Sequence, residues 1–106
     1  MGWLVDARFY PMRLQDVAHI RIDLLDADFW LVRRGSIESV GQPTREYSPY
    51  HIGIRVIETR LLLPDYLYYV FMHMHNSGQW QPHTHGTLSL VHIRVQDVKK
   101  IILSPY

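Results

Sequence analysis

The chain has 106 residues, 47% of them hydrophobic and 20% charged, and these proportions are ordinary for one globular domain. It has no cysteine, which excludes disulfides, thiolate chemistry and cysteine-ligated zinc. The formal net charge of +1 excludes a strongly acidic DNA mimic, and it is too small to indicate nucleic-acid binding by itself.

The first half of the chain predicts short elements separated by turns. The opening residues show neither a basic segment nor an apolar signal segment, and no run approaches the roughly 20 apolar residues of a membrane span. The expected elements are a strand at Trp3–Tyr10, one or two helical turns in Arg13–His19, a strand at Ile20–Leu24, a strand at Phe29–Arg34, and a long loop at Gly35–Pro49 with room for a short strand at Ser36–Val40. We expect a cytoplasmic protein without membrane association, forming one domain over residues 1–106.

A strand is clearest at His51–Ile57, where Ile52, Ile54 and Val56 alternate with residues of the opposite face. A helix over residues 64–76 follows. Pro64 suits a first helical turn, and the apolar positions that form one face of this helix are Leu67, Val70, Phe71 and Met74.

The C-terminal segment predicts a strand at Thr87–Val95, a turn or helical turn at Gln96–Lys100, and a closing strand at Ile101–Leu103. The elements together predict an α+β fold, with a mixed or mostly antiparallel sheet and one principal helix.

Two His-x-His pairs, His73 with His75 and His83 with His85, raise the possibility of a metal site. Residues two apart share a face on a strand, but on a helix they are separated by about 200°. The helical pattern reaches His75, so His73 and His75 would point away from each other. The sequence therefore predicts that no metal is bound, and a small cupin-like metal-binding protein stays as an alternative.

The polar segment that follows the helix has residue types suited to DNA. Glutamine amides such as those of Gln79 and Gln81 pair with base edges, an exposed Trp80 would stack on a base, and His83 and His85 can donate to phosphate. The alternative is that Trp80 caps the core. No nucleophile elbow, phosphate loop or dinucleotide fingerprint is present, so we expect a non-enzymatic protein without a cofactor.

Several segments resemble motifs of one family, and they occur in that family's order. Leu62–Tyr69 is similar to a Leu-Pro-Glu-Tyr-Leu-Tyr-Tyr signature, Gly86-Thr87 to a Gly-Ser/Thr stretch, and Asp97–Pro105 to a closing strand. Upstream, Arg13–Ile20 is similar to the family's opening motif, and Val32–Ile37 is similar to its strand-turn motif. The family is the target-recognition domain of type I restriction-modification specificity subunits, here in a reduced, stand-alone form.

The resemblance implies a domain that reads DNA through its loops Gln42–Tyr50 and Gln79–Thr87 and has no catalytic residues. The residues expected to contact DNA are Arg33, Arg34 and Arg45 at phosphates, and Gln79, Trp80, Gln81, His83 and His85 at bases or in the groove. The implied partners are DNA and possibly a methyltransferase or restriction subunit. A homodimeric protein-interaction module is the other alternative.

Overall fold

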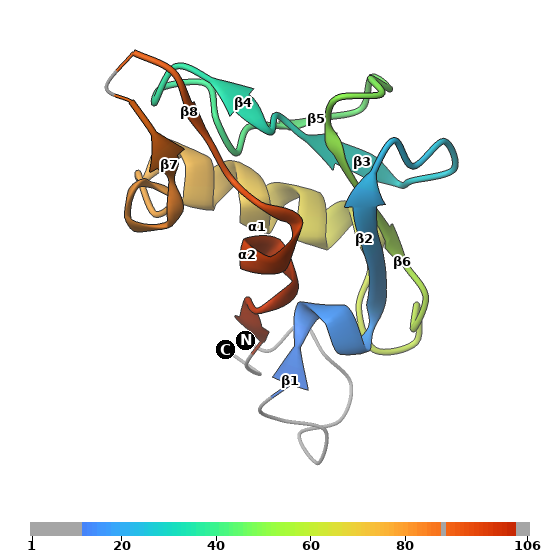
Figure 1. The fold of residues 1–106 in the computed structure, drawn as a ribbon. Helices are drawn as coiled ribbons and strands as arrows, with labels where there is room; N and C mark the ends of the chain where they lie inside the picture. Colours follow the sequence, from blue (N-terminus) through green and yellow to red (C-terminus); the bar gives the residue numbers. More distant parts are fainter. Residues whose placement is uncertain (1–11, 88, 104–106) are drawn as a thin grey trace.

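Three antiparallel sheets and one long helix make up the structure, a computed structural model that describes residues 12–87 and 89–103 (Figure 1). The strands are β1 (Met12–Arg13), β2 (Ala18–Ile22), β3 (Phe29–Leu31), β4 (Arg34–Gly35), β5 (Pro43–Thr44), β6 (Ile52–Val56), β7 (His85–Gly86), β8 (Val91–His92) and β9 (Ile102–Leu103). The helices are α1 (Pro64–Asn76) and α2 (Val95–Lys99), with 3₁₀ turns η2 (Leu14–Asp16) and η3 (Gln81–His83). The α+β fold and the principal helix over residues 64–76 are confirmed.

The largest sheet has the strand order β2-β6-β3-β5, and β6 lies between β2 and β3. Ile52 and Ile54 are fully buried while Arg55 is exposed, which confirms the predicted alternation. Gly53 is also buried, because a Cβ atom there would lie 2.6 Å from the Cβ of Leu24. The hairpin segment after β2 therefore needs glycine at this position to approach the sheet.

Helix α1 packs on the four-stranded sheet through its apolar face. Leu67 and Phe71 are buried, and Met74 packs against the same core. The ring of Phe71 lies 5.9 Å from that of Phe29 on β3, which joins helix and sheet directly. Burying side chains of this size contributes about 1.5–3 kcal/mol each, so packing against the sheet accounts for more of the helix's stability than its intrinsic propensity.

The hydrophobic core is continuous and draws on every part of the described chain. No charged or polar residue among residues 12–87 and 89–103 is fully buried. The core side chains with the least exposure are Phe29, Phe71, Leu14, Leu31, Ile52, Ile54, Leu62, Leu67, Ile93, Val40 and Val98.

Several short elements differ from the sequence expectation. The predicted strand Trp3–Tyr10 lies outside the described residues. The helical turns expected in residues 13–19 reduce to the 3₁₀ turn η2, because β2 already begins at Ala18. The segment Phe29–Arg34 divides into β3 and β4. Ser36–Val40 is a turn rather than a strand, since the Val40 N–H donates to the Ser36 carbonyl at 3.1 Å.

The strand predicted at Thr87–Val95 is largely replaced by other structure. Only Val91–His92 forms a strand, and helix α2 starts at Val95. The reason is a cap, in which the backbone N–H of Arg94 donates to Asp97 at 2.9 Å and fixes the first turn. The predicted closing strand is confirmed in part, since β9 pairs with β1.

Candidate nucleic-acid interface

Trp80 is buried, so the expectation that it stacks on a base from an exposed loop is wrong. Only 3% of the residue is exposed, and its ring stacks on Phe71 with 5.9 Å between centroids and 7° between planes. A Cβ atom at Gly41 would lie 2.2 Å from its Cδ1 atom, so the indole edge packs on that glycine. The chain turns back after α1 at Gly78, where φ is +72°, and this reversal directs the indole into the core.

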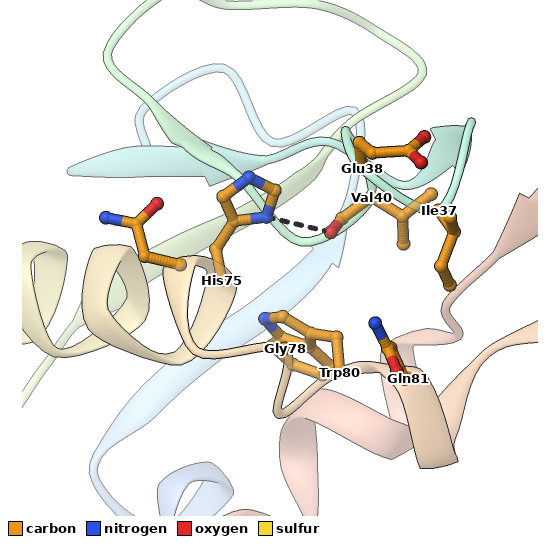
Figure 2. Close-up of a pocket in the computed structure, with 8 residues that line it drawn as sticks. Ile37, Glu38, Val40, His75, Gly78, Trp80 and Gln81 are labelled. Carbon is orange, nitrogen blue, oxygen red and sulfur yellow. Dashed lines mark hydrogen bonds between the residues drawn. The ribbon is translucent and has the colours of Figure 1, made fainter.

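A half-open pocket of about 310 Å³ lies beside this indole, between the turn at residues 37–40 and the end of α1 (Figure 2). On its helix side, the Nδ1 atom of His75 is 3.1 Å from the Val40 carbonyl. The Trp80 Nε1 donor has no hydrogen-bond partner among the described residues. The contact between His75 and Val40 ties the last turn of α1 to residues 36–41, so His75 has a structural role.

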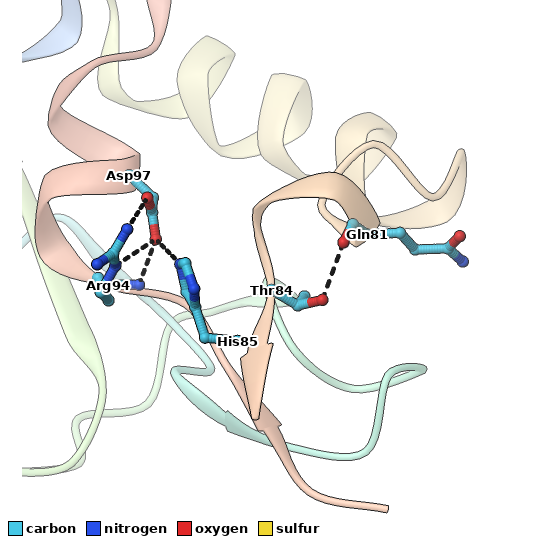
Figure 3. A network of polar contacts seen from close by, with 5 residues as sticks. All are labelled: Gln81, Thr84, His85, Arg94 and Asp97. Atoms are coloured by element: carbon cyan, nitrogen blue, oxygen red, sulfur yellow. Dashed lines mark hydrogen bonds and ion pairs between the residues drawn. The ribbon is translucent and has the colours of Figure 1, made fainter. Parts of the chain in front are cut away.

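Gln79, Gln81 and His83 all lie on the outside of the molecule. The Gln79 amide donates to the Ser77 hydroxyl at 2.9 Å. Gln81 opens the turn η3, and its backbone carbonyl accepts from the Thr84 hydroxyl at 2.9 Å (Figure 3). The residue is exposed and also lines the pocket beside Trp80. These three polar side chains are therefore exposed, and their contact with DNA stays a prediction.

The structure places three basic or imidazole side chains in one row across the sheet β4-β8-β7. Arg34 on β4 is directly opposite His92 on β8, and His92 is directly opposite His85 on β7. Directly opposed residues project from the same face of a sheet. The two imidazole rings lie 5.5 Å apart, and Arg34 is exposed at the end of the row. Strand pairing thus brings together residues that lie 51 positions apart in sequence, counting from 34 to 85.

His92 lies in this row, and the sequence alone indicates no role for it beyond its place in the strand predicted at Thr87–Val95. One feature of the sequence points to a shared surface: His92 and Arg94 fall on the same face of the predicted strand, which follows the polar loop. What the sequence did not contain was the register that sets His92 between Arg34 and His85.

His85 is oriented by the carboxylate of Asp97 (Figure 3). Its Nε2 atom lies 3.1 Å from Oδ2 of Asp97, and the same carboxylate accepts from the backbone N–H of Arg94 at 2.9 Å and from its guanidinium at 3.4 Å. Burial acts to raise the pKa of Asp97, but the hydrogen bonds from Arg94 and His85 outweigh it and hold that pKa below its ordinary value. Asp97 is therefore ionised at neutral pH, and Nδ1 is the ring nitrogen of His85 left for a ligand.

The other two predicted arginines lie apart from this row. Arg33 donates from Nε to the Tyr50 carbonyl at 3.0 Å, which anchors the loop before β6. Arg45 pairs with Asp65 at 3.3 Å, and its guanidinium carbon lies 4.1 Å from the centre of the Tyr68 ring. Asp65 is in the first turn of α1, about 16 Å along the helix from its last residue at a rise of 1.5 Å per residue. Arg45 and Gln81 therefore lie near opposite ends of α1 and do not form one surface.

The histidine pairs do not converge on a single point. Within residues 12–87 and 89–103 there is no group of three or more His, Asp or Glu side chains arranged to hold a metal ion. His73 is exposed on α1, whereas His75 contacts Val40 and His85 contacts Asp97.

None of the described helices is both long and apolar enough to cross a bilayer. Comparison with known proteins adds no relative to this description. No family model matches the chain, and no curated protein or solved structure matches it.

Proposed function

We propose that this domain binds DNA through the row formed by Arg34, His92 and His85, hereafter the cationic row, and through the neighbouring turn η3. The observation that carries the proposal is the register of the sheet β4-β8-β7, which aligns a guanidinium and two imidazoles on one face. Side chains of these types donate to phosphate oxygens. The resemblance to target-recognition domains points to the same class of ligand.

The spacing of the cationic row suits a sugar-phosphate backbone. Directly opposed residues on neighbouring strands are about 5 Å apart, so the span from Arg34 to His85 is about 10 Å. One strand of B-DNA advances about 3.4 Å along the axis per phosphate, so the row would face about three successive phosphates. Gln81 and His83 precede β7 by only a few residues and are exposed beside it. The row would hold the backbone while the glutamines contact groove edges.

Two features determine which side chains of the row would contact phosphate. The contact with Asp97 fixes the ring of His85, so its Nδ1–H can donate to phosphate when the imidazole carries two protons. Arg34 is exposed and forms no ion pair with the described residues, so its charge is available. Trp80 and Arg45 are not included in this interface, because one is buried and the other lies at the far end of α1.

Fluorescence anisotropy with a labelled 20-base-pair duplex tests the proposal, with salt varied from about 50 to about 200 mM. Affinity should fall steeply with salt, and Arg34→Ala should weaken binding several-fold and reduce the salt slope by about one. Arg21→Ala is the matched control, because Arg21 is an exposed strand arginine on the other large sheet. Absence of binding at tens of micromolar protein in low salt, or an equal loss in the Arg21 variant, would contradict the proposal.

A further inference from the structure

Among the described residues, strand β2 lies at the edge of the four-stranded sheet, with only β6 beside it. The Asp23 N–H donates to the His51 carbonyl at 3.4 Å, so the odd-numbered residues of this strand pair toward β6. Hydrogen-bonding direction alternates along an antiparallel strand, so the N–H and C=O groups of Ala18, Ile20 and Ile22 point outward. Within the described residues these outward groups have no backbone partner.

A groove of about 570 Å³ runs along this edge. Its apolar part is formed by Ala18, Ile20 and Leu24, while Arg21 on β2 and Lys99 on α2 supply charged groups. An edge strand with an adjoining apolar groove is the arrangement that binds an extended peptide as an added strand. Backbone hydrogen bonds then give affinity, and the alternating side chains give selectivity.

The charge of the groove selects the partner. Arg21 and Lys99 form no ion pair with the described residues. Asp16 is the one carboxylate among the residues that line the groove, and it accepts from the backbone N–H of Arg13 at 2.9 Å. The two cationic side chains outnumber it. A second copy of β2 would bring His19 opposite Arg21 in an antiparallel pair centred on Ile20, which gives Arg21 no carboxylate to pair with.

We propose that the β2 edge binds an extended segment of a partner protein in which apolar and acidic residues alternate. Residues of the segment opposite Ala18 and Ile20 would lie on the apolar side, and the acidic residues would face Arg21 and Lys99. This surface belongs to a different sheet from the cationic row, so it is independent of DNA binding.

The probe is a fluorescein-labelled, N-acetylated Val-Glu-Val-Glu-Val peptide, titrated into the full chain by anisotropy and by amide NMR. We expect saturable binding, with shifted signals and slowed hydrogen exchange at Ala18, Ile20 and Ile22. A Val-Lys-Val-Lys-Val peptide should bind about tenfold more weakly. A peptide methylated at its alternate backbone nitrogens should not bind, because it cannot complete the ladder.

Two charge reversals separate this site from the DNA site. Arg21→Glu should weaken peptide binding about tenfold and leave DNA affinity unchanged, while Arg34→Glu should do the reverse. Equal binding of the lysine peptide, no binding of the acidic one at millimolar concentration, or unmoved β2 signals would overturn the proposal. A dimer mass in light scattering, with the same three amides protected in the absence of peptide, would assign the edge to a second copy and also overturn it. Failure of DNA binding alone leaves the peptide result intact.

Discussion

Replacing Gly41 with alanine tests the packing of Trp80 most directly. The added Cβ atom would lie 2.2 Å from Cδ1 and 2.5 Å from Nε1 of the indole, so the ring must move out of its stack on Phe71. Overpacking of this kind costs about 1–3 kcal/mol. The φ angle of +85° adds backbone strain of about 1–2 kcal/mol for a non-glycine residue. The free energy of unfolding should therefore fall by about 2–5 kcal/mol.

Gly78→Ala provides the matched control. Gly78 has a similar φ of +72°, but an added Cβ there would meet only the Gln81 side chain, at an ordinary 3.5 Å. It should lose about 1–2 kcal/mol, from the backbone alone. Urea denaturation of both variants, followed by circular dichroism, measures the difference. If Gly41→Ala and Gly78→Ala cost the same, the close contact between Trp80 and residue 41 does not exist, and the argument for a buried indole fails.

Three further variants test the candidate interface. His92→Ala should weaken DNA binding several-fold in anisotropy, because its imidazole lies between Arg34 and His85 in the proposed row; an affinity equal to that of the wild type would count against the proposal. Arg45→Ala should leave DNA affinity unchanged and cost at most about 1 kcal/mol of stability by thermal denaturation, since its ion pair is exposed. Asp97→Asn should destabilise the fold by about 1–2 kcal/mol at pH 7 through loss of a charged cap. Because the folded-state pKa of Asp97 is lowered, its contribution is present above the unfolded value near 4 and is lost as pH falls through the folded value. The stabilities of wild type and Asp97→Asn should thus converge as pH falls below the folded-state pKa of Asp97, and a gap that persists in that range would refute the assignment.

The parts of the fold that the sequence predicted well are those with long periodic patterns. The strand around Ile54 and the helix around Phe71 each carry a period that matches their secondary structure, and burial of their apolar faces reinforces it. The two-residue strands β4, β7 and β8 have no such pattern. Their existence depends on pairing partners far away in the chain, which local propensity does not encode.

The candidate site shows the same division. Arg34 and His85 were predicted to contact DNA on residue type and resemblance, and that role stays a prediction, while their alignment through His92 needed the register. The sequence leaves open whether Trp80 stacks on a base or caps the core, because a polar neighbourhood does not tell which way one aromatic residue turns; its burial confirms the second alternative. The determining partner is Gly41, which approaches the indole from 39 positions earlier in the chain, counting from 41 to 80.

The brevity of β4, β7 and β8 has a consequence for how the cationic row would meet a ligand. Two residues per strand provide few ladder hydrogen bonds, and segments of this kind open locally at a lower free energy than a core strand such as β6. Amide protons of this sheet should accordingly exchange with solvent well before that of Ile54. Because this sheet can open locally while the core stays folded, it could adapt its shape to the ligand that we propose without unfolding the molecule.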